Sequence, residues 1–208
     1  KLYTQYHNYK VSNDSDERPI QVQKEIPPVH GYSINRPLDF KINDDLFFNP
    51  KINIVLPSLK KVHMSGGPNT VLLFAIKLTE SGENIRLISS DLSIDGEEDS
   101  LFKHLKVLIN RKILKDKIEI VDGVDKTFNT DVGIEIGVND IFIASAWWTA
   151  QTIYNDALPL TNIKKFFYVI QDFEPILHEG STFYARALET YCMNHIPIIN
   201  TSLLLDHL

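Results

Sequence analysis

Two apolar segments of the chain end in aromatic or polar residues, and those residues are the first candidates for chemistry. One segment is IFIASA (141–146) and the other is FFYVIQ (166–171). In a parallel α/β sheet, ligands collect at the carboxyl ends of the strands, where the chain turns toward the next helix. We therefore expect both ends to open onto one edge of a sheet. The residues concerned are Trp147, Trp148, Thr149, Gln171, Asp172 and Glu174.

The string QDFEP places two carboxylates two residues apart. Because Pro175 disfavours the α conformation at Glu174, we expect the segment to stay extended, with Asp172 and Glu174 on one side and about 6 to 7 Å apart at Cα. Such a pair on a crevice rim can bind hydroxyl groups or act as acid and base. A solvated surface turn is the alternative. A glycosidase pair is disfavoured, because those carboxylates normally come from separate elements. His178 follows closely enough to reach the same crevice.

The adjacent tryptophans Trp147 and Trp148 cannot easily both be buried on the same side of a strand end. One of them is expected to pack into the core. The exposed one would form a stacking platform for a sugar ring, whose C–H faces suit an aromatic plane. A purely structural role for both is the alternative.

The loop MSGGPNT is the strongest local motif. Gly66 and Gly67 let the backbone approach a ligand, and the helix that follows offers unpaired N–H groups and a positive dipole end to an anion. The loop is neither a GxGxxG fingerprint nor a P-loop, and a tight strand-to-helix turn explains the glycines equally well. Asp91, at the end of the next predicted strand, stands where a dinucleotide-binding fold carries its ribose carboxylate. Without the fingerprint, we interpret this placement as a coincidence.

No metal site is expected from the sequence. The seven histidines include no HExxH motif and no close pair. The lone Cys192 excludes a thiolate zinc site and an internal disulfide, which suits a cytoplasmic protein.

Composition excludes several classes of partner. The 208 residues carry a formal net charge of -6, and lysines and arginines occur singly or in pairs, so a nucleic-acid partner is not expected. No apolar run approaches the roughly 20 residues that a membrane helix needs, and the polar start KLYTQYHNYK has no secretory core. We expect a cytoplasmic protein, with any membrane contact peripheral and at the inner face.

The chain divides into two regions. Residues 1–50 contain five prolines and scattered aromatics without helix or strand period, which predicts an extended arm. Residues 51–208 alternate short apolar runs with helical stretches, which predicts one Rossmann-like α/β domain with a mostly parallel sheet and helices on both faces. The predicted strands are 52–57, 84–91, 117–122, 141–146, 166–171 and 196–201, with IEIGV as a further short strand.

Helix signals lie between these strands. A helix follows Gly66 and Gly67, with Pro68 in its first turn and Gly82 at its end. The other helices are expected after a cap at Asp99 or Ser100, from about Thr149 to Ala157, from near Ser181 and after Ser202. The sequence stops six residues after Ser202, so we expect a fragment of a longer protein.

Several of these strings together resemble a known family. INIVLPSL, SGGPNTVLLFAIKL, IFIASAWWTA, FFYVIQDFEP and STFYARALETY are similar, in this order and spacing, to the N-terminal domain of GT-B glycosyltransferases. The resemblance is to bacterial rhamnosyltransferases of the WsaF type, within glycosyltransferase family four. It covers about residues 37–208.

The resemblance implies transfer of a sugar with retention, often rhamnose from dTDP-rhamnose, to a growing bacterial surface glycan, without a bound metal. In such enzymes the N-terminal domain presents the acceptor, and the C-terminal domain holds most of the nucleotide. This chain lacks that second domain, so it is not expected to catalyse transfer alone. The residues assigned on this basis are Gly66, Gly67 and Asn69 for the donor, Trp147, Trp148, Thr149 and His178 for the acceptor, and Gln171, Asp172 and Glu174 for catalysis.

Two alternatives stay open at this point. One is a Rossmann-type methyltransferase or dehydrogenase that uses the glycine loop and Asp91. The other is a non-catalytic carbohydrate-binding module that uses the aromatic arm and the paired tryptophans.

Overall fold

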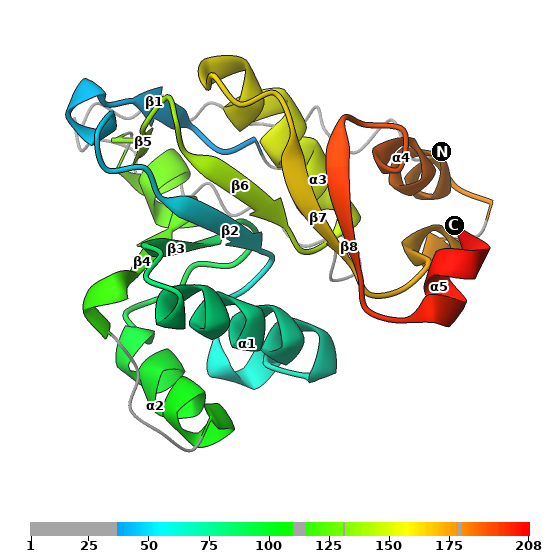
Figure 1. Ribbon diagram of the computed structural model, residues 1–208, viewed down its shortest axis with the longest axis horizontal. Coiled ribbons are helices and arrows are strands. Elements are labelled where there is room, and N and C mark those ends of the chain that lie inside the picture. Colours follow the sequence, from blue (N-terminus) through cyan, green and yellow to red (C-terminus); the bar gives the residue numbers. More distant parts are fainter. Residues whose placement is uncertain (1–36, 110–114, 131, 179) are drawn as a thin grey trace, which may run out of the picture.

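The central sheet consists of six parallel strands (Figure 1). In this computed structural model, the described residues are 37–109, 115–130, 132–178 and 180–208. The strand order is β4-β3-β2-β6-β7-β8, which is the order of a Rossmann fold when these strands are numbered along the chain. The order reverses between β2 and β6. The strands are β2 (Ile52–Leu56), β3 (Ile85–Ser89), β4 (Ile118–Asp122), β6 (Ile141–Ala144), β7 (Phe166–Ile170) and β8 (His195–Ile199).

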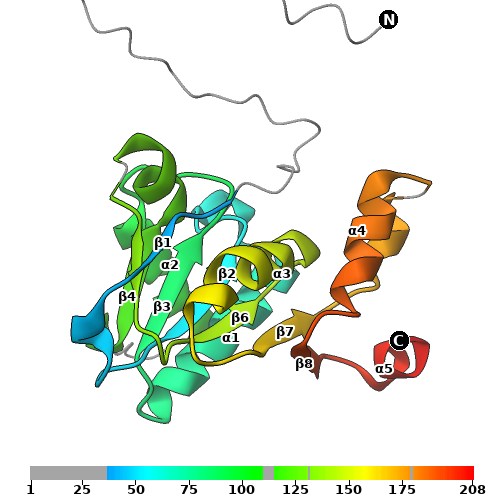
Figure 2. The same cartoon turned by 90° about the horizontal axis from the view of Figure 1, so that it is seen from above.

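Helices cover both faces of this sheet. Figure 1 shows α1 and α2 on one side and α3 on the other. Both views place α4 and α5 beyond β8, at the end of the sheet opposite to α2 (Figure 1 and Figure 2). The helices are α1 (Gly66–Glu80), α2 (Glu98–Ile109), α3 (Trp147–Thr152), α4 (Thr182–Thr190) and α5 (Ser202–His207). Short 3-10 turns span Asp44–Leu46, Lys61–His63, Lys115–Lys117, Leu158–Leu160 and Glu174–His178, and π turns span Asp125–Asn129 and Ile153–Ala157.

The core has two layers because strand residues alternate between the faces. Ile54 faces α1 and packs in a cluster with Val71, whereas Val55 belongs to a cluster on the other face with Ala150 and Ile153 of the α3 segment. All five side chains are fully buried. Burial on both faces explains why the strands read as continuous apolar runs rather than as alternating ones.

A second, two-stranded parallel sheet joins β1 (Phe40–Ile42) to β5 (Ile134–Ile136). Leu38 and Phe40 are buried, and the Phe40 ring meets Phe142 of the main sheet edge to face. Residues 37–50 are therefore part of the domain, and the predicted arm is wrong for them, because two apolar side chains anchor this segment to the core. The rest of the predicted arm, residues 1–36, lies outside the described residues.

The predicted elements of the sheet are confirmed, with small shifts at helix starts. α2 begins at Glu98, just before the predicted caps, and α3 begins two residues before Thr149. The cap of α5 is Thr201, which accepts a hydrogen bond from Leu204 N, rather than Ser202. The helix expected from near Ser181 is confirmed as α4, and Ser181 is its N-cap and accepts a hydrogen bond from Tyr184 N.

A buried polar network ties the amino ends of the strands together. Asp140 is fully buried and accepts hydrogen bonds from Lys51 N at 2.9 Å and Asn53 Nδ2 at 3.0 Å. Arg86 donates to Asn53 Oδ1 at 3.2 Å and to the Glu135 carbonyl of β5 at 2.7 Å. The network therefore connects the main sheet to the small one at the edge opposite to the carboxyl ends.

Replacing Asp140 with alanine is expected to destabilise the fold by about 2 to 4 kcal/mol, because it leaves buried donors without an acceptor beside Arg86. Urea unfolding of Asp140→Ala measures this, with the exposed Asp116→Ala as control. Equal unfolding midpoints for the two variants would show that the network contributes nothing to stability.

Candidate functional site

A cavity of about 460 Å³ opens at the carboxyl ends of β2, β6 and β7. It lies where the strand order reverses, which is the usual ligand position in a doubly wound sheet. Strand ends, the start of α1 and the turn after β7 all contribute to its wall. The lining residues are Leu56, Pro57, Ser65, Gly67, Pro68, Val71, Ser145, Ala146, Trp147, Trp148, Gln171, Asp172, Glu174, Leu177 and His178.

Of the three residues predicted to bind the donor, only Gly67 lines the cavity. A Cβ built on Gly67 would lie 3.5 Å from Gln171 Oε1, so the glycine leaves room for the Gln171 side chain. Gly66 is exposed and is not among the lining residues. The Asn69 side chain turns away from the cavity toward α2, where its Oδ1 lies 2.7 Å from His104 Nε2.

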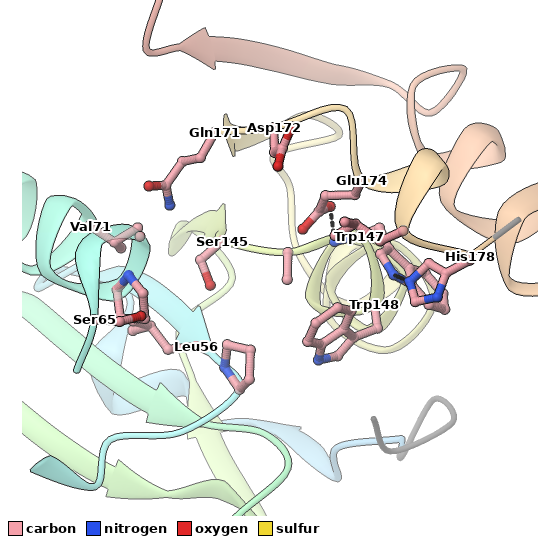
Figure 3. Close-up of a pocket in the computed structure, with 15 residues that line it drawn as sticks. Leu56, Ser65, Val71, Ser145, Trp147, Trp148, Gln171, Asp172, Glu174 and His178 are labelled. Atoms are coloured by element: carbon pink, nitrogen blue, oxygen red, sulfur yellow. Dashed lines mark hydrogen bonds between the residues drawn. The ribbon is translucent and has the colours of Figure 1, made fainter. Parts of the chain in front are cut away.

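Trp147 is the buried member of the tryptophan pair, with 2% of its surface exposed. Its backbone N–H donates to Glu174 Oε2 at 2.7 Å, and its indole N–H donates to His178 Nε2 at 3.1 Å. The second bond requires an unprotonated Nε2, so His178 carries its proton on Nδ1. Two side chains of the Glu174–His178 turn thus hold one tryptophan (Figure 3).

Trp148 is partly exposed and lines the cavity, which confirms that the two tryptophans divide between core and surface. Its indole N–H donates to Asp91 Oδ2 at 2.8 Å. Its ring meets that of Trp147 nearly edge to face, with centroids 5.5 Å apart.

Thr149 is fully buried and does not line the cavity. Its Oγ1 accepts hydrogen bonds from Ser145 N and Ala146 N, both at 3.0 Å. The side chain therefore fixes the turn from β6 into α3, which is a structural role.

The sequence predicted an extended QDFEP segment, and this prediction is wrong. Glu174 begins a 3-10 turn that runs to His178. Pro175 occupies the second position of the turn, where its missing N–H is not needed. Asp172 is exposed and accepts from Phe173 N at 2.8 Å, whereas the Glu174 carboxylate points inward. Both carboxylates line the cavity but experience different environments.

Burial raises the pKa of Glu174 to about 7. Hydrogen bonds from Tyr168 Oη at 2.5 Å and from Trp147 N favour the carboxylate and offset part of that effect, while the charge of Asp172 raises the pKa further. Burial, followed by the charge of Glu174, also holds the pKa of Tyr168 well above its usual value. A carboxyl group that titrates near neutral pH beside a cavity is suited to proton exchange with a ligand.

Comparison with known families matches most of the chain to a family model. The family model described as "WsaF, N-terminal domain" matches residues 51–202. The chain belongs to the WsaF N-terminal domain family. A search among curated proteins finds no match.

The WsaF assignment agrees with the fold. The match spans all six strands of the main sheet, and the Rossmann-like α/β architecture is that of one half of a GT-B enzyme. The family points to a function related to glycosyl transfer. It does not favour the methyltransferase or dehydrogenase alternative, and Asp91, on which that alternative depends, binds Trp148.

Among the described residues, no three or more His, Cys, Asp or Glu side chains gather as a metal site. Over the same residues, the structure has no helix with the length and apolar character to span a bilayer.

Ser145 and Tyr168 were not predicted as site residues from the sequence. Ser145 follows β6 directly, lines the cavity and donates to the Val55 carbonyl at 2.8 Å. Its place at a strand end is a signal that could have identified it. Tyr168 lies inside β7 among apolar residues, so its bond to Glu174 could not be read from the local pattern.

The raised pKa of Glu174 predicts a pH-dependent stability. The protonated form is favoured by folding, so its stabilising contribution is complete below the ordinary pKa of 4.5 and is lost as the pH rises through about 7. The Glu174→Gln variant cannot ionise at this position, so it does not lose this contribution. The free energy of unfolding of the variant minus that of the native chain should therefore increase by roughly 2 to 3 kcal/mol between pH 4.5 and pH 8.

Urea unfolding at several pH values measures the effect, and the exposed Glu189→Gln serves as control. Parallel stability curves for Glu174→Gln and the native chain would show that the pKa of Glu174 is not raised.

Proposed function

We propose that this domain is the acceptor-side half of a bacterial glycosyltransferase and that the cavity binds a sugar of the acceptor. The observation that carries the proposal is the placement of Trp148 beside Gln171, Asp172 and Glu174 in one cavity at the switch point of a WsaF domain. Figure 3 shows the three polar residues along one side of the cavity and the Trp148 ring on another.

The chemistry of the lining suits an uncharged sugar. Sugars combine apolar C–H faces with hydroxyl groups, and the wall offers both an indole surface and hydrogen-bonding side chains. Asp172 and Glu174 supply negative charge, while the described lining contains no lysine or arginine. An anionic acceptor sugar beside Asp172 and Glu174 would face two carboxylates without a compensating cation in the described lining.

The exposed carboxylate of Asp172 and the amide of Gln171 are proposed to bind acceptor hydroxyls. Glu174 is proposed to lie beside the reacting hydroxyl, where its ionised form can accept the proton. The new bond joins that oxygen to the anomeric carbon of the donor, and the bond to the nucleotide diphosphate breaks. We propose retention at the anomeric carbon, with dTDP-rhamnose as donor and without a metal.

The donor is proposed to approach the start of α1. Gly66 and Gly67 form the first turn of this 15-residue helix, whose N–H groups and dipole favour an anion such as a diphosphate. Most of the nucleotide would be held by a C-terminal GT-B domain that follows this one. The enzyme would act in the cytoplasm, with any membrane contact peripheral and at the inner face.

Gly67→Val in the two-domain protein is expected to lower transfer at least tenfold, or about 1.4 kcal/mol of barrier, because the branched side chain reaches past the Cβ position into Gln171. Gly67→Ala is the matched control, since its Cβ has ordinary contact distances and should leave most of the activity. Unchanged kinetics in the valine variant would show that the loop is only a turn.

Asp172→Asn keeps the shape of the side chain and removes its charge. We expect saccharide affinity to fall by about tenfold, since a charge-assisted hydrogen bond contributes about 1.5 to 3 kcal/mol. The melting temperature should barely move, because Asp172 is exposed. Calorimetric titration with a rhamno-oligosaccharide and thermal unfolding measure the two effects, and a large melting shift with normal affinity would contradict the assignment.

The whole-protein test is transfer by the longer protein that contains a C-terminal domain. Formation of a rhamnosylated glycan from dTDP-rhamnose supports the proposal. Glycan binding without transfer from any nucleotide sugar would instead select the non-catalytic carbohydrate-binding module.

A further inference from the structure

Asp91 does not line the cavity, but it contacts a residue that does. It follows β3, whereas its partner Trp148 is the second residue of α3. We propose that Asp91 is a positioning residue, which fixes the plane of Trp148 so that the indole face forms a stacking surface for a sugar ring. The stacking part of this inference rests on the proposed function of the cavity.

The Trp148 ring is held on two sides. Its N–H donates to Asp91 Oδ2 at 2.8 Å, and its ring lies at 81° to that of Trp147. Trp147 is itself held by hydrogen bonds to Glu174 and His178, so Trp148 packs against a side chain that is fixed in place. In Figure 3, the Trp148 ring stands across the cavity from Gln171.

The backbone at Asp91 is hydrogen-bonded to another part of the cavity lining. Its backbone N–H donates to the Pro57 carbonyl at 3.0 Å, and Ser90 N donates to the Leu56 carbonyl at 2.9 Å. Leu56 and Pro57 both line the cavity. Asp91 therefore fixes Trp148 relative to Leu56 and Pro57, which belong to the same cavity lining.

Both oxygens of the Asp91 carboxylate have partners within the protein. Oδ1 accepts from Ser90 Oγ at 2.7 Å, and Oδ2 accepts from Trp148. A ribose hydroxyl would have to compete with these bonds. A charge-assisted bond of this kind restricts the rotation of the indole, and a surface that is already oriented loses less entropy when a ligand stacks on it.

Fluorine NMR of the chain labelled with 5-fluorotryptophan tests the contact, because the chain has two tryptophans and gives two signals. Trp148→Phe assigns them. Asp91→Ala should shift and broaden the Trp148 signal and leave the Trp147 signal in place. Asp91→Asn keeps an acceptor oxygen and should stay close to the native spectrum. A Trp148 signal that is unchanged in Asp91→Ala would overturn the proposal.

Titration with methyl α-L-rhamnopyranoside tests the consequence for binding. Asp91→Ala should weaken affinity about five- to tenfold, and in a Trp148→Ala background the same change should have less than a twofold effect. Additive losses would mean that Asp91 touches the ligand directly, and native affinity in Asp91→Ala would mean that the orientation of Trp148 does not matter. Either result overturns the proposal.

Titration with NAD and S-adenosylmethionine on the same samples tests the competing role. Binding that is lost in Asp91→Ala but kept in Trp148→Ala would assign Asp91 to a ribose and overturn the positioning role. If the native chain binds no saccharide, the proposed function and the stacking role fail together. A Trp148 fluorine signal that does not change in Asp91→Ala contradicts the positioning role alone. Failure of the positioning role can therefore be distinguished from failure of the proposed function.

Discussion

The parallel pairing of β2 with β6 is the constraint on which the site depends. Ile52 pairs with Ile141 and Val55 with Ala144, so the two strands end side by side. From these ends the chain leaves in opposite directions, to α1 on one face of the sheet and to α3 on the other (Figure 1). The divergence opens the cavity. Ser145, which lines the cavity, joins the two strand ends by donating from its Oγ to the Val55 carbonyl.

The Glu174 carboxyl links three parts of the structure around this opening. It accepts from the first N–H of α3, accepts from Tyr168 inside β7, and begins the turn that carries His178. The ionised form is the better acceptor for both bonds, whereas burial favours the protonated form. Burial outweighs the hydrogen bonds and raises the pKa to about 7, so the charge of the cavity and the strength of the bond to Trp147 N depend on the same proton.

The sequence predicted the elements of the sheet because buried parallel strands are short apolar runs separated by turn residues and helical stretches. It also predicted that Trp147, Trp148, Gln171, Asp172 and Glu174 would lie at one edge, since the carboxyl ends of such strands lie together, and these residues line one cavity. The same reasoning placed Thr149 there as well, and Thr149 is not in the lining. β1 and β5 are different. β1 has three residues in a proline-containing segment and is stabilised by pairing with a strand more than 90 positions away, which no local pattern reveals.

The roles of individual side chains were less predictable than their positions. Thr149 was expected near a ligand, yet it fixes the turn into α3. Asp91 was considered as a ligand of a ribose only in an alternative, and in the structure it binds an indole. The start of the turn at Glu174 was missed because the preference of a residue before proline is weak compared with two hydrogen bonds to its carboxylate. Such pairings depend on the packed structure, and they can be identified only once distant strands have been placed together.

A crystal structure of the chain with a neutral rhamno-oligosaccharide would test the central claim most directly. The account predicts one sugar ring against the Trp148 face, with hydroxyl oxygens about 2.6 to 3.2 Å from the side chains of Gln171, Asp172 or Glu174. An oligosaccharide bound elsewhere on the domain, with this cavity empty at saturating concentration, would contradict it.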